Sequence, residues 1–225
     1  MNSHSAFNSA DAVAKYAEGP KRNVPGHSGL LPMTRILLAE RVPAEGRVLV
    51  VGAGGGLELE DLALANPGWR IDGVDPSAPM LDLAAQRLGP LTSRVALHEG
   101  YVQDAPEGPF DGATCLLTLH FLAPQERLRT VREVSRRLRP GAPFIVAHHS
   151  FPLQRRDAWL ARNAAFITAA GVPAAQARDG MQAMRDKLPV LDPQADEAIL
   201  RDAGFTDIEL FYAALTFKGW VCRKA

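Results

Sequence analysis

The chain has 225 residues, and its 25 lysines and arginines balance its 25 aspartates and glutamates, so the formal net charge is zero. This length suits one domain with a full hydrophobic core. A neutral chain lacks the broad positive field that draws proteins to nucleic acid or anionic membranes. No apolar run reaches about 18 residues, and Met1 to His4 lack a signal pattern, which predicts a cytoplasmic protein with no membrane partner.

The two cysteines, Cys115 and Cys222, lie in apolar stretches and do not have the spacing of metal ligands. We expect two reduced, buried thiols. The histidines, aspartates and glutamates also lack a convincing metal-binding spacing, so no metal site is predicted.

Helices are predicted before residue 46 at 6–17 and 30–41, with Gly19-Pro20 and Pro25-Gly26 as the breakers between them. Strands and helices then alternate. The predicted strands are 48–51, 71–74, 95–97, 113–119 and 144–147, and the predicted helices are 57–65, 79–88 and 125–138. Strands this continuously apolar are buried on both faces, which predicts a doubly wound, Rossmann-like α/β sheet that is mostly parallel.

The regular alternation ends after the fifth strand. Two helices are predicted within 155–188, another over 193–203, and two closing strands over 208–212 and 217–222. The gap between these last strands is too short for a crossover helix, so an antiparallel hairpin is expected.

A glycine-rich turn at 52–56 follows the first strand, and Asp75 closes the second strand 23 positions after Gly52. Such a turn lets the backbone approach a ligand, and the carboxylate can accept both hydroxyls of a ribose. Dinucleotide enzymes need a glycine where this chain has Leu57. The acidic first turn of the next helix, with Glu58 and Glu60, opposes pyrophosphate but tolerates a cationic sulfonium, which favours S-adenosylmethionine.

These features resemble the class I S-adenosylmethionine-dependent methyltransferases over nearly the whole chain. The resemblance is carried by the glycine turn, the segment 75–81, Phe110-Asp111 before the fourth strand, and the segment 138–141 before the fifth. It implies a seven-stranded sheet with an antiparallel hairpin at its end.

The resemblance also implies a cofactor site. Gly52 and Gly54 would lie under the methionine and ribose, Asp75 would bind the ribose, and Tyr101 would flank the adenine. The full set of expected cofactor-binding residues is His27, Gly52, Ala53, Gly54, Gly56, Asp75, Pro76, Met80, Tyr101, Val102, Leu116 and Thr118.

Two positions depart from the family pattern. Val50 stands where an acidic residue usually contacts the methionine ammonium, and Tyr101 stands where an acid commonly binds the adenine amino group, although Asp104 follows three residues later. Each loss corresponds to about 1–2 kcal/mol of binding. These departures motivate an alternative function, a regulatory protein that binds the cofactor without catalysis.

Within the family, the chain looks most like the bacterial tRNA-uridine carboxymethyltransferases that use carboxy-S-adenosylmethionine. The likeness lies in the segments 24–27, 118–122 and 203–205, in Ser150-Phe151 and in the closing hairpin. Those enzymes carry an arginine for the extra carboxylate where this chain has Ile199. The resemblance therefore implies ordinary S-adenosylmethionine, an N-terminal lid over residues 1–45 beside a methyltransferase domain over 46–225, and allows a homodimer.

Methyl transfer mainly requires alignment of the reactants and exclusion of water, and a base is needed only if the acceptor loses a proton early. The candidate catalytic residues are His120, which follows the fourth strand, and His149, at the end of the fifth. His148 and His149 are adjacent in a strand, so at most one of them faces the site. His27 is expected to touch the cofactor.

A small-molecule acceptor is the favoured partner. The helix at 125–138 is rich in arginine, but Glu126 and Glu133 interrupt it and the arginines do not form one stripe, so a solvated face is expected. Apolar residues of a helical insertion, about 151–191, could roof the acceptor pocket or pack between helices; they are Trp159, Phe166, Met181 and Met184. A tRNA-modifying methyltransferase and a nicotinamide oxidoreductase stay open as less favoured alternatives.

Overall fold

The computed structural model describes residues 19–225, so the helix expected at 6–17 lies outside the described residues. Within the described part, no helix is both long enough and apolar enough to cross a membrane. The remaining expectations can be compared with the structure element by element.

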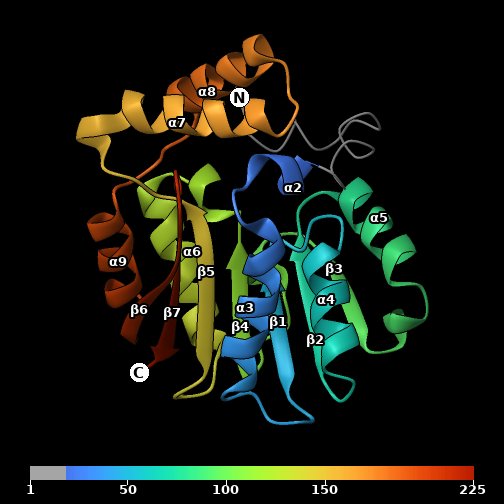
Figure 1. Cartoon of the computed structure of the whole chain (residues 1–225). Helices are drawn as coiled ribbons and strands as arrows, with labels where there is room; N and C mark the ends of the chain where they lie inside the picture. Colours follow the sequence, from blue (N-terminus) through green and yellow to red (C-terminus); the bar gives the residue numbers. More distant parts are fainter. Residues whose placement is uncertain (1–18) are drawn as a thin grey trace.

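One seven-stranded sheet forms the centre of the fold, with the strand order β3-β2-β1-β4-β5-β7-β6 (Figure 1). The first five strands are parallel, and β7 runs antiparallel to both β5 and β6. The strands are β1 Arg47–Val51, β2 Arg70–Asp75, β3 Val95–Glu99, β4 Gly112–Leu116, β5 Pro143–His149, β6 Phe205–Ala214 and β7 Phe217–Lys224. The predicted Rossmann-like fold and its antiparallel closing hairpin are confirmed.

Helices cover both faces of the sheet, and the alternation of side chains along β1 explains why both faces are apolar. Val48 and Val50 pack in the core under α3 (His27–Ala39), α4 (Leu57–Ala65) and α5 (Ala78–Leu88). Leu49 and Val51 pack in the opposite core, under α6 (Pro124–Arg137) and α9 (Pro193–Asp202). The helices predicted at 57–65, 79–88, 125–138 and 193–203 therefore have the places that a doubly wound sheet requires.

Three more helices lie beyond the carboxyl ends of the parallel strands, at the top of Figure 1. They are α2 (Gly19–Asn23), α7 (Arg156–Ala169) and α8 (Ala174–Lys187). Short 3₁₀ turns complete the chain at Gly89–Ser93, Val102–Asp104, Leu119–Phe121 and Leu153–Arg155. α3 packs in the core of the sheet, so within the described residues α2 has the position expected of a lid. The division into residues 1–45 and 46–225 stays a prediction.

Gly19 and Pro20 are the first described residues of α2, where proline suits a first helical turn; the helix that they were expected to end lies outside the described residues. One predicted boundary is wrong. β4 ends at Leu116 and not at residue 119, because Leu117 adopts a left-handed conformation with φ of 57°. The chain turns there, at the edge of the sheet where ligands bind in open α/β folds.

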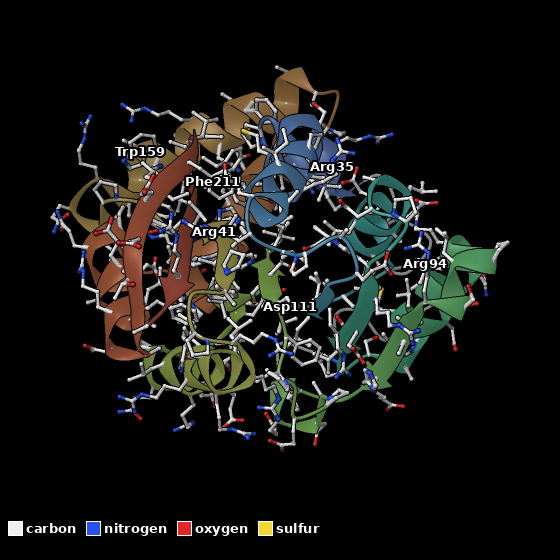
Figure 2. All side chains as sticks on the ribbon, turned by 90° about the horizontal axis from the view of Figure 1, so that it is seen from below. Arg35, Arg41, Arg94, Asp111, Trp159 and Phe211 are labelled. Carbon is white, nitrogen blue, oxygen red and sulfur yellow. The ribbon has the colours of Figure 1, made fainter. Side chains whose placement is uncertain are left out.

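The opposite edge of the sheet, seen from below in Figure 2, is closed by polar contacts around Asp111. The Asp111 carboxylate accepts a hydrogen bond from the Arg47 backbone N–H at 2.8 Å and pairs with Arg139 at 2.9 Å. These contacts pair polar groups next to the starts of β1 and β4. In open α/β sheets, ligands bind at the other edge, beyond the carboxyl ends of the strands.

The arginines of α6 do not all face solvent, which corrects the expected solvated face. Arg127 and Arg137 are each 1% exposed. Arg137 donates to the Gln103 carbonyl at 2.9 Å and to Glu133, and Arg127 is held by the Asp196 carboxylate of α9. These two side chains join α6 to neighbouring segments and do not contribute to a positive surface.

Candidate functional site

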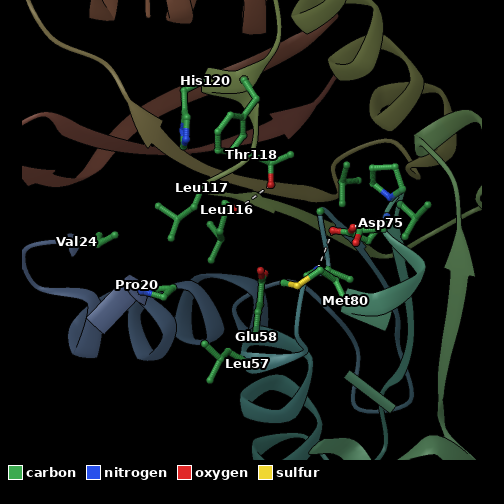
Figure 3. Close-up of a pocket in the computed structure, with 18 of the residues that line it drawn as sticks. Pro20, Val24, Leu57, Glu58, Asp75, Met80, Leu116, Leu117, Thr118 and His120 are labelled. Atoms are coloured by element: carbon green, nitrogen blue, oxygen red, sulfur yellow. Dashed lines mark hydrogen bonds between the residues drawn. The ribbon is translucent and has the colours of Figure 1, made fainter. Parts of the chain in front are cut away.

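A cavity of about 510 Å³ lies at the carboxyl edge of the parallel strands (Figure 3). The first turn of α4, the turn after β1, the end of β2, the segment after β4 and the region of α2 form its wall. Every residue predicted for the cofactor or for catalysis lines this cavity except Gly56. These residues come from segments that are far apart along the chain, and their roles in binding and catalysis stay predictions.

The glycine turn after β1 lies very close to the segment that follows β4. Gly52 has φ of 77°, and a Cβ atom there would lie 2.1 Å from the Thr118 hydroxyl oxygen. The backbone N–H groups of Gly52 and Ala53 donate to the Val74 carbonyl at 2.9 and 3.0 Å, which ties the turn to β2. The Thr118 hydroxyl in turn donates to the Leu116 carbonyl at 3.0 Å. The floor of the cavity is thus bare backbone, held rigidly.

Asp75 connects the end of β2 to the glycine turn. One oxygen of its carboxylate accepts a hydrogen bond from the Gly54 N–H and the other accepts one from the Ser77 N–H, both at 2.9 Å. Each carboxylate oxygen has more than one lone pair, so these bonds leave acceptor capacity on the cavity side. The arrangement suits the predicted contact with vicinal hydroxyls.

Gly56 does not line the cavity and has a packing role. It precedes α4 with φ of 82°, and a Cβ atom there would lie 2.9 Å from the Ala84 Cα atom in α5. We expect Gly56→Ala to lower the free energy of unfolding by about 1–3 kcal/mol, from left-handed strain and overpacking. Gly180→Ala is the matched control, because Gly180 in α8 has nothing within 4 Å of an added Cβ.

The control should leave stability unchanged or raise it by about 0.5–1 kcal/mol, as for an exposed helical glycine. Urea denaturation of both variants measures the difference. Equal behaviour of Gly56→Ala and Gly180→Ala would refute a packing role for Gly56.

Tyr101 and Val102 line the cavity after β3, as expected for the adenine edge. Tyr101 is 44% exposed, whereas Val102 is buried. The Asp104 carboxylate accepts the Tyr101 backbone N–H at 2.8 Å. Asp104 therefore caps its own turn and is not one of the cavity residues.

His120 and His149 meet at one wall of the cavity, with ring centroids 4.8 Å apart. The His149 backbone N–H donates to His120 Nδ1 at 3.4 Å, so the neutral His120 ring carries its proton on Nε2. His149 Nδ1 lies 3.0 Å from the Thr216 hydroxyl oxygen. His148 points the other way, with Nε2 3.2 Å from the Asp196 carboxylate, which confirms that only one of the two adjacent histidines faces the site.

His120 and His149 are both neutral near pH 7. Burial lowers the pKa of His149 to about 3, and the neighbouring His148 adds to the effect. Burial, followed by the proximity of His149, holds the pKa of His120 well below its usual value. The two rings can exchange hydrogen bonds with a ligand, but they do not place a positive charge in the cavity.

Glu58 is a carboxylate of the cavity wall that was not among the residues predicted for the site. It comes from the first turn of α4, is 8% exposed, and points toward Met80 and the space below Leu116 in Figure 3. The sequence carries a signal for its burial, because Glu58 lies four residues before Leu62 on the buried side of the helix.

The rest of the wall is mainly apolar, and it contains no lysine or arginine among the side chains that the structure describes, which are those of residues 19, 20 and 22–225. Leucine side chains from several segments dominate it: Leu30, Leu31, Leu57, Leu116, Leu117 and Leu122. The four insertion residues that could have roofed the cavity pack between α7, α8 and the chain around them; they are Trp159, Phe166, Met181 and Met184. Helix packing is therefore their role in this structure.

Residue 199 also lies elsewhere. Ile199 is in α9, packed against the core beneath α6, and does not line the cavity. The absence of an arginine at this position therefore gives no support for ordinary S-adenosylmethionine as the cofactor.

Cys115 and Cys222 are free and buried as predicted, and burial raises the pKa of both thiols.

A family model described as a methyltransferase domain matches residues 49–144. This range runs from β1 into β5 and contains the glycine turn, Asp75 and the turn after β4. The chain carries an S-adenosylmethionine-dependent methyltransferase domain. Among curated relatives, the methyltransferase is 25% identical to carboxy-S-adenosyl-L-methionine synthase of Chromohalobacter salexigens, over 94% of this chain and 81% of the relative. An uncharacterized methyltransferase of Anoxybacillus flavithermus is 33% identical over 46% of this chain and 47% of the relative.

Solved methyltransferase structures share the fold. An O-methyltransferase family protein from Burkholderia thailandensis superposes with a TM-score of 0.72 at 15% identity, over 99% of this chain and 62% of that protein. Human N-acetylserotonin methyltransferase, in complex with S-adenosylmethionine, superposes with a TM-score of 0.59 at 16% identity, over 95% of this chain and 58% of that protein. The methyltransferase thus spans about three fifths of the length of each, and the likeness concerns the fold.

The cavity residues fit S-adenosylmethionine, the cofactor of the domain. Gly52 lines the cavity with bare backbone, because Thr118 leaves no room for a Cβ atom there, and bare backbone lets a ligand approach closely. Asp75 is at the carboxyl end of β2, in the place expected for a ribose contact. The cavity also contains two carboxylates and no lysine or arginine among the described residues, which suits a positively charged ligand.

Proposed function

We propose that this methyltransferase transfers a methyl group from S-adenosylmethionine to an uncharged small-molecule acceptor that binds beside His120 and His149. The observation that carries the proposal is the wall of the cavity, which is mainly apolar and, among the side chains that the structure describes (residues 19, 20 and 22–225), free of lysine and arginine. An anionic acceptor would lack a charged partner there, and desolvating an unpaired charge costs several kcal/mol.

The protein's part in the reaction is to orient the reactants and exclude water. S-adenosylmethionine, when bound, supplies a methyl group already activated on a sulfonium. Gly52 and Asp75 would hold the nucleoside and methionine parts. Leu116 and Thr118 would line the side of the cavity on which the methyl group is presented. Rigid placement of this kind supplies most of the acceleration in a displacement that needs little acid–base help.

The histidines would position the acceptor rather than remove its proton. His120 offers an Nε2–H donor, because its Nδ1 accepts the His149 backbone N–H. With a pKa of about 3, His149 is too weak a base to deprotonate an alcohol or phenol efficiently near pH 7. The geometry therefore favours an acceptor atom that is nucleophilic while still protonated, such as the nitrogen of a neutral amine.

A carboxylated cofactor is the first alternative, because the curated relative from Chromohalobacter salexigens is named a carboxy-S-adenosyl-L-methionine synthase. The family resemblance to tRNA-uridine carboxymethyltransferases points the same way. Carboxy-S-adenosylmethionine carries an extra carboxylate next to the sulfonium, and a cationic side chain is the expected partner of such a group. The described cavity wall has none, which supports plain methyl transfer as the function of this chain.

Transfer RNA is less well supported as the acceptor. Of the six arginines in and after α6, Arg127 and Arg137 are buried, and the remainder include Arg129, Arg136 and Arg139, which pair with nearby carboxylates. Backbone binding normally uses several unpaired cations on one surface. A homodimer stays a prediction from the family resemblance.

The test uses acceptor pairs that differ by one carboxylate: aniline with 4-aminobenzoate, and catechol with 3,4-dihydroxybenzoate. We expect S-adenosylhomocysteine to accumulate, measured by mass spectrometry, with uncharged members at rates at least about tenfold higher, since an unpaired buried charge costs more than 1.4 kcal/mol. Total transfer RNA is included as a separate acceptor.

Faster reaction with the carboxylated members, or reaction with transfer RNA alone, would contradict the proposal. The non-catalytic alternative makes a different prediction, which is tight binding of S-adenosylhomocysteine by calorimetry with no turnover on the panel or on a metabolite extract. That outcome would replace methyl transfer by cofactor sensing.

A further inference from the structure

The methionine end of the cofactor lacks the acidic partner that the family pattern places at residue 50. Val50 is fully buried in the core between the sheet and α4, so its side chain contributes no charge. An ammonium group entering this end of the cavity would need another carboxylate, because a desolvated ammonium without a partner is costly. Among the described cavity residues, the carboxylates are Asp75 and Glu58, and Asp75 is bonded to the glycine turn.

The Glu58 carboxyl group lies on the face of the sheet from which the side chain of residue 50 projects. Val50 in β1 and Thr114 in β4 are register partners, so their side chains project from the same face. The Thr114 hydroxyl is also the side chain that acts on the Glu58 carboxyl group, lowering its pKa against the larger effect of burial. The carboxyl group therefore lies beside the position that an acidic residue 50 would have reached.

The Glu58 carboxyl group is buried and has no cationic partner among the described side chains. Its Oε1 atom has no hydrogen-bond partner, and none of the ion pairs among these side chains includes Glu58. Glu60, two residues later on the same helix, is instead paired with Arg87 at 3.3 Å. A buried carboxyl group that lines a ligand cavity and keeps one oxygen without a hydrogen bond is costly for folding alone, which indicates that a ligand completes it.

We propose that Glu58 binds the α-ammonium group of the methionine moiety of S-adenosylmethionine, in place of the acidic residue missing at Val50. The proposal rests on S-adenosylmethionine as the cofactor. It makes Glu58 a binding residue that acts on the amino acid end of the ligand and not on its nucleoside. Met80, beside Glu58 in Figure 3, and Leu116 would shield the pair from water.

Binding of the ligand's ammonium group should depend on pH through the charge state of Glu58. Burial raises the pKa of Glu58 to about 7, and Asp61 on the same helix adds to this rise. The other titratable neighbour is the buried Cys115 thiol of β4, which stays protonated because burial raises its pKa. The remaining titratable side chains of the described cavity are Asp75, Tyr101, His27, His120 and His149.

An ammonium ion binds the carboxylate and not the carboxylic acid, so ligand binding should lower the pKa of Glu58. Affinity for S-adenosylhomocysteine should then fall as pH decreases below about 7, by up to about tenfold per pH unit, because a proton must leave before the pair forms. Above about pH 8 the group is ionised without ligand and the affinity should level off.

The experiment compares two ligands on the full chain by calorimetric titration. S-adenosylhomocysteine has the amino acid end, whereas 5′-methylthioadenosine has the same nucleoside without it. We expect Glu58→Gln to weaken S-adenosylhomocysteine by about 10- to 100-fold and to leave 5′-methylthioadenosine within about threefold. Glu60→Gln is the matched control, because it removes the same charge from the same helix and keeps an acceptor for Arg87.

Equal losses for both ligands, or none for either, in Glu58→Gln would overturn the proposal. The wild-type protein provides an independent measurement that needs no variant, namely proton release on binding S-adenosylhomocysteine at pH 7 in two buffers of different ionisation heat. Absence of proton release would also count against Glu58. Failure of the wild-type protein to bind S-adenosylhomocysteine at all would instead refute the cofactor, and with it the proposed function.

Discussion

Asp75→Asn is expected to weaken binding of S-adenosylhomocysteine by about 100-fold, because hydrogen bonds from ribose hydroxyls to a charged carboxylate are lost. The glycine turn should loosen as well. The carboxylate accepts from both the Gly54 and the Ser77 N–H groups, whereas an asparagine has one acceptor oxygen and would turn its NH₂ toward the other donor. Calorimetric titration measures the affinity, and thermal denaturation of the same samples reports any loss of fold.

Asp82→Asn is the control for this change. Asp82 is an exposed carboxylate on α5, so the variant alters net charge by the same amount without touching the cavity. Its affinity should stay within about threefold of wild type, as expected for a screened surface charge. If Asp75→Asn bound the ligand as tightly as Asp82→Asn, Asp75 would have no role in the site.

Arg127→Ala is expected to lower the free energy of unfolding by about 3–5 kcal/mol, because it leaves the buried Asp196 carboxylate without its main partner. Arg127 also donates to the Pro189 carbonyl at 3.1 Å, so the change removes a link between α6 and the segment before α9. His148, with Nε2 3.2 Å from Asp196, cannot replace the guanidinium fork. Urea denaturation followed by circular dichroism measures the loss.

Arg129→Ala serves as the comparison on the same helix. Arg129 is 68% exposed and lies 3.8 Å from Glu126, a surface pair that contributes about 0–1 kcal/mol. A loss in Arg127→Ala no larger than that in Arg129→Ala would mean that the buried pair contributes nothing to stability. Arg127→Met, which fills the volume without the charge, tells whether packing or pairing is lost.

The strands of the sheet could be predicted because the requirement for a buried strand concerns only consecutive residues of the chain. A strand covered on both faces must be apolar at consecutive positions, and Val48 to Val51 meet that requirement before any tertiary contact is known. Short gaps between such runs identify crossover helices, and the four-residue gap before residue 217 identified the hairpin. The order β3-β2-β1-β4-β5-β7-β6 was not predicted and comes from the structure.

Charge patterns along α6 were less informative. The alternation of arginine and glutamate predicted a solvated face, yet Arg127 and Arg137 are buried because their partners come from other segments. Asp196 is 69 residues from Arg127, and the Gln103 carbonyl is 34 residues from Arg137. A pattern within one helix carries no information on acceptors supplied from so far away.

By itself, the sequence determined the fold class and the cofactor, because apolar strands, a glycine turn and a strand-ending carboxylate are local features whose geometry follows from their own residues. The tertiary structure alone decided that Glu58 enters the cavity beside Thr114, that Ile199 does not, and that the described wall carries no cation. These properties depend on which face of each element meets its neighbours, and that is settled by packing between distant segments of the chain.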